Sequence, residues 1–432
     1  MSATATFTPF AAVPAQTYMQ DGDPLLFKHA RTWWLLLALF LLAQGNGIFT
    51  VASGAGEKLK TLKQFYSPST TTLVMLTVVL WVVGAGLMVK RIGPIRGLML
   101  EQKAVLSFAI LAFLSTLWSP DPSLTLRKAT LLFLTFAFAW FFAASYPSAD
   151  QMRVLLAAGF ILALSSTAMA ILLPKYGLDS GGEWKGVFAQ KNELGFAMFF
   201  LFSGLVFRPS GYGLRRIALL AILPFGLIVM SQSKESLVLA ILLVVVRLYA
   251  PFVKNSRKDQ LPFILFATIF AVLGVVFGRE IILSLLGRDS TLTGRTQEWA
   301  ILFPYALKHF WLGYGYQGFW TGTGDSLRAI TKLRAAIRGA DSGYLDTMLQ
   351  FGIAGIILWL VVMLATVKDF LRLFRMPAVS RIVYWYASLI LATFVGSFVG
   401  TIFLFPTTLG SFAFVFACAG LRNLNRENAL VL

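Results

Sequence analysis

The sequence predicts an all-α polytopic membrane protein, and three observations point to this fold class. First, 57% of the 432 residues are hydrophobic and only 13% are charged, whereas soluble domains usually carry about 25% charged residues. Second, uncharged runs close to or above the roughly 18–20 residues that cross a bilayer recur along the chain. Third, basic residues gather in short segments between these runs, as they do in membrane proteins. A large soluble helical core does not need so many full-length apolar runs.

We expect about twelve transmembrane helices. Nine fall in residues 29–278 and three in residues 351–421, after a polar, flexible N-terminus at 1–28 and before a short tail at 422–432. The expected centres of the helices lie near Ala38, Val79, Leu111, Ala137, Ala163, Phe200, Ile222, Ile241, Phe270, Trp359, Ala392 and Val415.

The positions of lysine and arginine set the expected orientation of these helices. With the N-terminus inside, the inner segments hold most of these residues once the 279–350 loop is left aside, because long loops are weak topology signals. Both termini are therefore expected in the cytoplasm. The connections that carry Lys185, Lys191 and Lys234 then face outward together with the 279–350 loop. Three basic connections are thus expected to meet on the outer side of the membrane.

Charge and composition exclude several other classes. The net charge of +18 sits in short loops between apolar runs, which indicates anionic lipid heads rather than nucleic acid. The single cysteine, Cys418, excludes an intrachain disulfide and a cysteine-based metal cluster. The only histidines, His29 and His309, are far apart in sequence, so a histidine-rich metal site is excluded. We therefore expect no metal and no cofactor.

The long 279–350 loop carries two predicted helices. The first covers residues 295–309, because apolar residues recur there at helical spacing. The second begins at Asp325 as its N-cap and runs to Arg338, with Gly339 as its stop. This second helix is basic and amphipathic, which is typical of a helix lying at the lipid interface. The apolar face of the first helix consists of Trp299, Leu302, Tyr305 and Ala306.

A polar, basic island at residues 287–299 is the most informative part of this loop. Arg288 and Arg295 belong to it, and the planar guanidinium group suits bidentate binding of phosphate. Arg295 shares a helix face with Glu298, three residues later. The alternative for these arginines is salt bridging within the loop, to Asp289 or Glu298.

The two other outward connections add lysines. Lys185 and Lys191 are expected to help hold phosphate, with Asn192 beside them at a helix start where free N–H groups favour anions; otherwise they are solvated loop charges. Lys234 and Glu235 lie in a short turn between two apolar runs. Ionisable groups at such depth are usually functional and paired, although an interfacial lysine that reaches toward water is the alternative.

Asp341 is the expected general base, since it is a carboxylate close to several arginines just before the next apolar run. Its alternative role is the N-cap of the following helix. Glu298 and His309 compete with it as bases. His309 is instead expected to pack with Phe310 and Trp311 at the membrane interface.

Seven short motifs occur in order along the chain between residues 105 and 365. They are WSPDP (118–122), GVF (186–188), KNELG (191–195), SQSK (231–234), LTGRTQEW (292–299), LGYGYQGFW (312–320) and SGYLD (342–346). Together they resemble the O-antigen ligase and polymerase superfamily, in particular exopolysaccharide polymerases of the Wzy and ExoQ type. Two positions depart from that family, which often has His-Asn where this chain has Asp341-Ser342, and often Arg where it has Lys234.

The resemblance implies a metal-independent glycosyltransferase in the bacterial inner membrane, with 279–350 as one long helical periplasmic loop. Its substrate would be an oligosaccharide linked to undecaprenyl pyrophosphate, and its expected partners are membrane lipid, a flippase, and chain-length or export proteins. The expected function is that of an exopolysaccharide polymerase joining repeat units.

In this hypothesis Asp341, Arg295 and Glu298 are catalytic. The pyrophosphate is bound by Arg288, Arg295, Lys234, Lys191 and Lys185. Sugar-binding residues are Trp299, Tyr314, Tyr316, Trp320 and Asn192, with anchoring at the membrane interface as the alternative for the aromatic ones.

Two other functions stay open from the sequence. An O-antigen-type ligase would pass the same donor to another acceptor. A lipid-linked sugar flippase or other transporter usually places polar groups in broken helices at mid-membrane, often in paired halves, whereas here the charge is concentrated at one face and no paired halves are visible.

Overall fold

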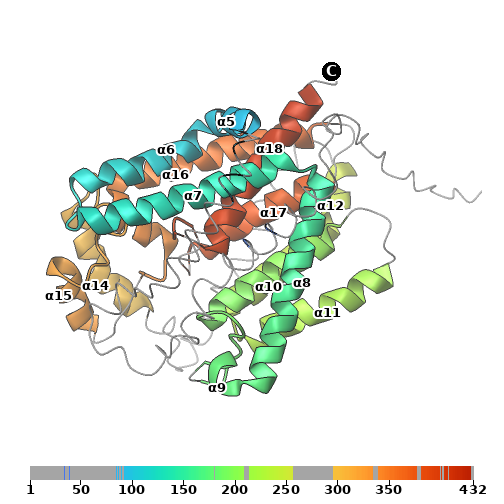
Figure 1. The fold of residues 1–432 in the computed structure, drawn as a ribbon, viewed down its shortest axis with the longest axis horizontal. Coiled ribbons are helices and arrows are strands. Elements are labelled where there is room, and N and C mark those ends of the chain that lie inside the picture. The colour runs from blue at the N-terminus through green and yellow to red at the C-terminus, as the bar shows by residue number, and fades with distance from the viewer. Residues whose placement is uncertain are drawn as a thin grey trace, which may run out of the picture.

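The computed structural model describes residues 92–179, 181–208, 214–255, 295–333, 339–376, 381–398, 403–406 and 408–429, with Trp34, Ala38, Gly84, Gly86, Val89 and Gly400 as single positions. The described residues form thirteen α-helices and one 3-10 helix (Figure 1). The helices are α5 (Ile92–Glu101), α6 (Lys103–Leu114), η2 (Ser115–Leu117), α7 (Pro122–Ser145), α8 (Ser148–Leu172), α9 (Pro174–Gly177), α10 (Lys191–Val206), α11 (Leu214–Met230), α12 (Lys234–Asn255), α14 (Arg295–Lys308), α15 (Gly324–Leu333), α16 (Gly343–Phe374), α17 (Arg381–Gly396) and α18 (Leu409–Ala429).

The predicted all-α class is confirmed for these residues. Each expected span centre from Leu111 to Ile241, and from Trp359 to Val415, lies inside a helix. Ala38 is helical as a single position, whereas Val79 and Phe270 lie outside the described residues.

Helices long and apolar enough to cross a bilayer are fewer than the twelve expected. Within the described residues there are three, namely α7, α8 from Asp150 onward, and α16, or four if the bent pair of α5 with α6 and η2 is one span. The angle within that pair is 93°. The apolar α17 has 16 residues, about 24 Å at 1.5 Å per residue, which is less than the roughly 30 Å hydrocarbon core. The described helices support a membrane protein with several spans.

Large apolar side chains remain exposed on the outer faces of these helices. Leu164 and Leu172 on α8, Leu219 on α11 and Leu364 on α16 are among the most exposed. Large apolar side chains exposed along these helices suit contact with lipid.

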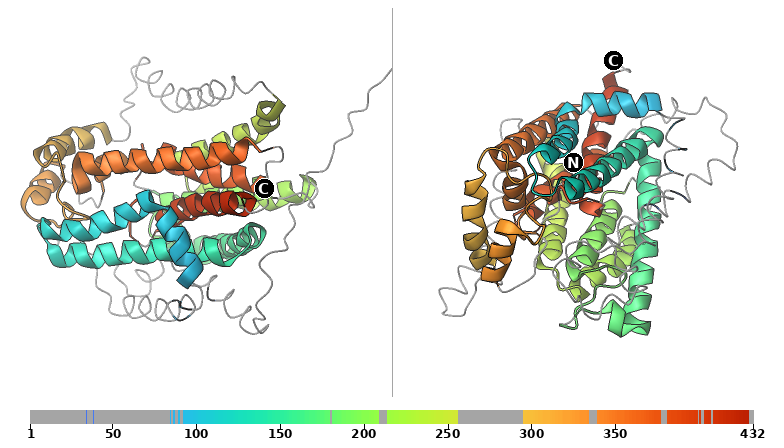
Figure 2. Two further views of the ribbon diagram at one scale, coloured as in Figure 1. Left: turned by 90° about the horizontal axis from the view of Figure 1, so that it is seen from above. Right: turned by 60° about the vertical axis from the view of Figure 1, so that its left-hand side comes forward.

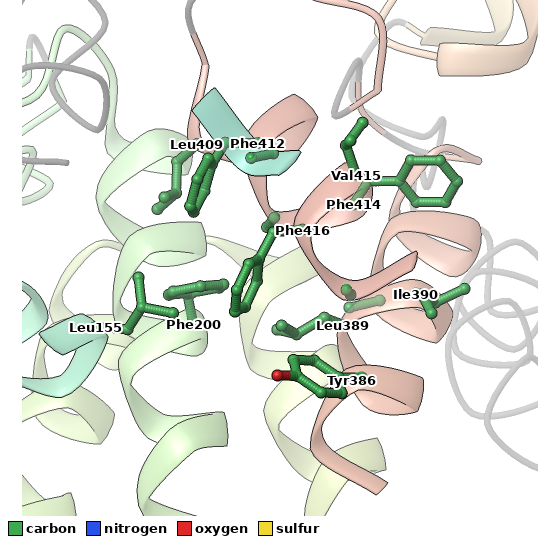
Figure 3. Packing of buried hydrophobic residues seen from close by; sticks show 14 of the residues in the cluster. Leu155, Phe200, Tyr386, Leu389, Ile390, Leu409, Phe412, Phe414, Val415 and Phe416 are labelled. Atoms are coloured by element: carbon green, nitrogen blue, oxygen red, sulfur yellow. The ribbon is translucent and has the colours of Figure 1, made fainter. Parts of the chain in front are cut away.

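Aromatic side chains fill the centre of the bundle. α18 lies between α7 and α17 (Figures 1 and 2). The rings of Phe412 and Phe416 on α18 stack with centroids 5.6 Å apart, and Phe142 of α7 contacts both. Phe416 also meets Tyr386 of α17 (Figure 3). Gly420 is required beside this pair, because a Cβ there would lie 2.3 Å from the Tyr386 ring.

A break in α16 joins it to the chain that follows α14. Gly352 has φ 61° and ψ −155°, which interrupts the helix in a conformation that favours glycine. The amide of Ile353 donates to the Phe310 carbonyl at 2.7 Å, and the amide of Tyr314 donates to the Leu349 carbonyl at 2.8 Å. The segment 310–315 therefore satisfies backbone groups that the break leaves unpaired.

The two helices predicted in the long loop are both present. α14 matches the predicted 295–309 helix, and its buried Leu302 and Ala306 pack with Ala329 and Ile330 of α15. The prediction of Asp325 as the N-cap is wrong, because α15 begins at Gly324 and contains it. The predicted end near Arg338 falls in 334–338, outside the described residues.

The Asp325 carboxylate instead ties three parts of the loop together. It accepts hydrogen bonds from Lys308 Nζ at 2.6 Å and from the Tyr314 hydroxyl at 2.8 Å. These bonds hold α15 against the end of α14, beside the start of α16 (Figure 1).

Candidate functional site

The three connections expected to converge do lie together at one end of the described helices. The amide of Trp184 donates to the Met230 carbonyl at 3.1 Å, which joins the 183–190 segment to the end of α11. The start of α10 packs on the 231–236 turn at Gly195, where a Cβ would lie 2.6 Å from Ser233. The next residues, at the start of α12, face α14 through the charge contacts of Glu235 described below.

Arg295 and Asp341 form the central ion pair of this end. Arg295 Nε lies 3.6 Å from Asp341 Oδ2, and the side chains are 19% and 58% exposed, respectively. Arg295 is the first residue of α14, and Asp341 lies two residues before α16. The carboxylate is thus reachable from solvent while the guanidinium is mostly covered.

Neighbouring groups fix the backbone at Asp341. Its φ is +45°, an uncommon left-handed conformation for a non-glycine residue. Trp299 Nε1 donates to the Ala340 carbonyl at 2.8 Å, and the Ala340 amide donates to Asp346 Oδ2 at 3.1 Å. Trp320 Nε1 donates to the other oxygen of Asp346 at 2.9 Å. A strained residue held from both sides in this way is characteristic of functional sites.

The alternative role of Asp341 as the N-cap of α16 is wrong. The N-cap is Ser342, whose side chain accepts a hydrogen bond from the Leu345 amide. The Asp341 carboxylate is consequently not used for capping and faces Arg295.

Glu298 lies one turn along α14 from Arg295 and is only partly exposed. Its Oε1 is buried and has no hydrogen-bond partner among the described residues. Burial raises the pKa of Glu298 to about 7, repulsion from Asp341 and Asp346 acts in the same direction, and attraction to Arg295 opposes it. This carboxyl therefore changes its charge near neutral pH, unlike an ordinary glutamate.

Glu235 brings a further carboxyl group to the site from α12. It is attracted electrostatically by Arg295 and repelled by Asp341. A Cβ on Gly400 would lie 2.7 Å from Glu235 Oε2, so this carboxylate lies directly against Gly400. The carbonyl of Gly400 accepts from the Gly343 amide at 3.0 Å, which links this contact to the start of α16.

The predicted lysines are placed differently from one another. Lys191 Nζ lies 2.8 Å from Glu183 Oε1, and this hydrogen bond holds the pKa of Glu183 below its ordinary value. Lys234 and Asn192 are exposed at the starts of α12 and α10, and Lys185 is half-buried. Arg288 lies outside the described residues.

Three aromatic residues predicted to bind sugar, Tyr314, Tyr316 and Trp320, are buried within the protein. The Tyr316 ring stacks on Phe351 with centroids 5.8 Å apart, and its hydroxyl donates to the Leu404 carbonyl. Tyr314 is also buried, and its hydroxyl is held by Asp325. In this structure these rings support the site from inside, and their sugar-stacking role stays a prediction.

His309 is separated from the central ion pair by the whole of α14. The helix begins at Arg295 and has 14 residues, about 21 Å at 1.5 Å per residue. The His309 ring centroid lies 4.1 Å from that of Tyr314, and the packing of His309 with Phe310 and Trp311 stays a prediction.

Sequence reasoning gave no role to two of the carboxylates now placed at the site. Glu235 was singled out with Lys234, but a binding role was assigned only to the lysine. Asp346 lies in the SGYLD motif, yet nothing in a single sequence distinguishes a buried carboxylate that accepts two hydrogen bonds from an ordinary first-turn aspartate. In the part of the chain that the structure describes, no group of three or more His, Cys, Asp or Glu side chains is arranged to hold a metal ion.

The comparison with protein families covers the residues of this site. The family model Wzy_C, described as O-antigen ligase, matches residues 219–360. This segment of the chain is similar to O-antigen ligases. The resemblance expected from the short motifs is thereby confirmed. Wzy_C proteins are enzymes that act on lipid-linked glycans. The matched segment contains Glu235, Arg295, Glu298, Asp341 and Asp346.

Similarity to a curated protein extends beyond that segment. Over 351 residues the chain is 26% identical to the exopolysaccharide production protein ExoQ of Rhizobium meliloti (strain 1021). The match covers 76% of this chain and 79% of ExoQ. The chain is a distant homologue of ExoQ and, with its Wzy_C domain and several apolar helices, a membrane protein.

Proposed function

We propose that this Wzy_C protein is a membrane exopolysaccharide polymerase. It would join undecaprenyl-pyrophosphate-linked oligosaccharide repeat units at the periplasmic face of the bacterial inner membrane. The observation that carries the proposal is the Arg295–Asp341 pair, at 3.6 Å, within the matched domain. The similarity to ExoQ favours polymerisation over other reactions of lipid-linked glycans.

Arg295 is proposed to bind the diphosphate of the donor. A guanidinium group binds phosphate oxygens through two parallel N–H donors. The diphosphate would compete with Asp341 for Arg295, so that donor binding releases the carboxylate. Lys234, Lys191, Lys185 and Arg288 are proposed to add positive charge around the diphosphate.

The charge balance of the site makes the protonation of Glu298 important for this step. Arg295 interacts with Asp341, Glu298 and Glu235, so the cluster is negative when all three carboxyls are ionised. The pKa of Glu298 is raised to about 7, so below that pH this group is neutral. Donor binding is therefore expected to weaken as the pH rises through 7.

Asp341 is the proposed base that activates the acceptor. Its side chain is 58% exposed and its backbone is fixed, so a sugar hydroxyl can reach it in a defined position. The acceptor oxygen attacks the anomeric carbon of the donor, most simply with inversion, while the bond from that carbon to the diphosphate oxygen breaks. The proton of the hydroxyl passes to Asp341. Arg295 stabilises the negative charge on the departing undecaprenyl diphosphate, and the step as proposed draws on no metal ion.

The proposal includes the full topology expected from the sequence. In this topology the chain crosses the membrane twelve times, both termini lie in the cytoplasm, and residues 279–350 lie in the periplasm. Support comes from the placement of the site and of α14 and α15 at the same end of the helices.

An O-antigen-type ligase is the second candidate, favoured by the description of the matched family. It would use the same donor site and differ only in the acceptor. Mass analysis of lipid-linked intermediates in a deletion strain tests the two. Loss of a polymerase leaves single repeat units on the lipid, whereas loss of a ligase leaves long lipid-linked chains. Normal intermediates and normal polymer would contradict both.

A further inference from the structure

A cavity lies between α5, the end of α7 and α18, away from the candidate site. Its volume is about 330 Å³. Apolar groups form most of its wall, and α18 adds an amide and a guanidinium group. The lining residues are Gly93, Pro94, Leu98, Ala144, Asn423 and Arg426. A lining of this kind suits an amphiphile with a compact charged end.

This cavity and the candidate site lie near opposite ends of α16. α16 begins at Gly343, beside Asp341, and its last turns carry Asp369. From the break at Gly352 it continues to Phe374, and this part alone is about 33 Å long at 1.5 Å per residue. Asp369 Oδ1 lies 2.8 Å from Arg422 Nη1 on α18, so α18 reaches the cavity at the far end.

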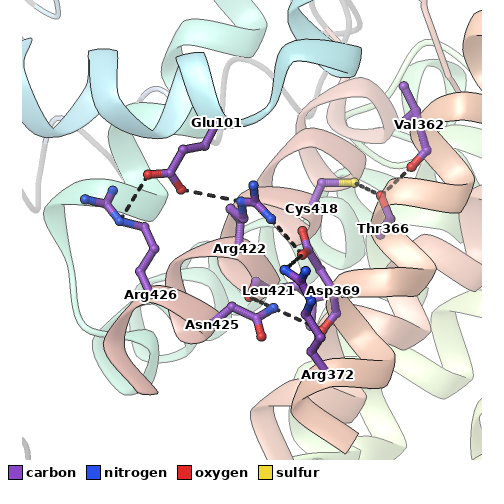
Figure 4. A network of polar contacts seen from close by, with 10 residues as sticks. All are labelled: Glu101, Val362, Thr366, Asp369, Arg372, Cys418, Leu421, Arg422, Asn425 and Arg426. Carbon is purple, nitrogen blue, oxygen red and sulfur yellow. Dashed lines mark hydrogen bonds and ion pairs between the residues drawn. The ribbon is translucent and has the colours of Figure 1, made fainter. Parts of the chain in front are cut away.

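Arginines outnumber carboxylates in the polar network beside the cavity (Figure 4). Glu101 lies between Arg422 and Arg426, at 3.4 Å from the Nε of each. Asp369 is shared between Arg422 and Arg372. Among the side chains that the structure describes, two carboxylates of this network thus face three arginines, which gives these groups a net positive charge.

Arg426 carries this charge to the cavity. Its Nε is used for Glu101, and its side chain is 44% exposed. Its Nη1 lies beside Gly97, 3.8 Å from the position that an added Cβ would take. The terminal nitrogens of Arg426 are therefore placed for a second anion besides Glu101.

α5 gives this end the character of a membrane surface. The helix is bent by 93° from α6 and lies across the ends of its neighbours (Figure 2). Ile92 and Leu100 are exposed at 66% and 45%, and Arg96 is exposed beside them. A helix with this arrangement lies in the interface, with its apolar side chains against acyl chains.

We propose that this cavity binds the headgroup of an anionic phospholipid, with the phosphate at Arg426 and the acyl chains along Ile92 and Leu100. Basic pockets between spanning helices favour such headgroups. A free phosphate ion would use Arg426 but would gain nothing from the exposed apolar side chains of α5. The lipid would fix α5 and α18 to one leaflet while the reaction proceeds at the other.

The full-length protein in nanodiscs tests this proposal. We expect tighter binding of phosphatidylglycerol than of phosphatidylcholine by native mass spectrometry, and a higher unfolding temperature with phosphatidylglycerol. Arg426→Gln should weaken phosphatidylglycerol binding about fivefold, the effect of one basic group near a lipid surface. Gly93→Leu should weaken it similarly by filling the cavity, without touching any ion pair.

The control is Arg328→Gln, an exposed arginine on α15 at the other end of α16. It should bind phosphatidylglycerol like the wild type. Equal binding of the two lipids, or unchanged phosphatidylglycerol binding in both cavity variants, overturns the proposal. So does an equal stabilisation by inorganic phosphate, because it would identify a free-anion site. These experiments measure lipid binding rather than polymer formation, so their outcome is independent of the proposed polymerase activity.

Discussion

Asp346 positions Asp341 through the backbone of Ala340. The buried carboxylate of Asp346 accepts the Ala340 amide at 3.1 Å and Trp320 Nε1 at 2.9 Å. The residue next to Ala340 is Asp341, held at φ +45° with its carboxylate 3.6 Å from Arg295 Nε. The buried carboxylate of Asp346 thus fixes the position of the solvent-exposed proposed base, Asp341.

Replacing Asp346 should therefore cost both stability and activity. Asp346→Ala leaves two buried N–H donors without their acceptor, at about 1–3 kcal/mol each. We expect a lower unfolding temperature and reduced polymer formation per folded molecule. Asp150→Ala, which removes a surface carboxylate paired with the exposed Arg153, should cost less. An unchanged unfolding temperature in Asp346→Ala would contradict the positioning role.

Arg295→Ala should abolish polymer while leaving protein level and membrane insertion intact. Loss of a preorganised donor at developing negative charge costs about 10²–10³ in rate. Polymer yield in a deletion strain complemented with the variant is the measurement. The control Arg328→Ala removes an exposed arginine of the same loop, and this variant should give a normal polymer yield. Normal yield from Arg295→Ala would remove this residue from the mechanism.

Asp341→Asn should lower the rate by about 10²–10⁴, the usual contribution of a general base. Asparagine tolerates the left-handed backbone, so the loop should keep its shape. Ser342→Ala removes the true N-cap of α16 and should cost about 1 kcal/mol of stability with little loss of rate. Comparing the two variants distinguishes the role of a general base from that of a helix cap. Full activity in Asp341→Asn would exclude Asp341 as the base.

Glu298→Gln should change how stability depends on pH. The pKa of Glu298 is raised from an ordinary 4.5 to about 7, so the folded protein binds this proton more tightly than the unfolded chain. The contribution is fully present below about pH 4.5 and is lost as the pH rises through 7. Glutamine carries no charge, so the variant should gain unfolding temperature over the wild type at pH 8 but not at pH 5. An equal difference at both pH values would show that Glu298 titrates normally.

Gly352→Ala should destabilise the connection between α16 and the segment after α14. The residue has φ 61°, and a Cβ would lie 2.5 Å from the Phe310 carbonyl oxygen. We expect a lower unfolding temperature or loss of folded protein in detergent. Gly226→Ala in α11, where an added Cβ meets nothing within 4 Å, should be neutral or slightly stabilising. Equal stability of both variants would mean that the break in α16 is not required.

Local patterns were sufficient for the helices of this chain. Apolar runs predicted the positions of α6 to α8, α10 to α12 and α16 to α18, and 3–4 spacing predicted α14 and its buried face of Leu302 and Ala306. The short motifs were sufficient for the family. The N-cap predictions for Asp325 and Asp341 were both wrong. Each carboxylate pairs with a cation or a hydroxyl group that is distant in sequence and close only in the folded protein.

The sequence by itself determined that this chain is helical, rich in apolar runs and related to O-antigen ligases, because hydrophobic periodicity and short motifs are local properties. Only the tertiary structure decided which charges meet. Glu235 and Arg295 are separated by a long stretch of sequence, yet they interact electrostatically, Glu235 near the start of α12 and Arg295 at the start of α14. The electrostatic energy depends on distance and burial, and both are set only when the helices have packed.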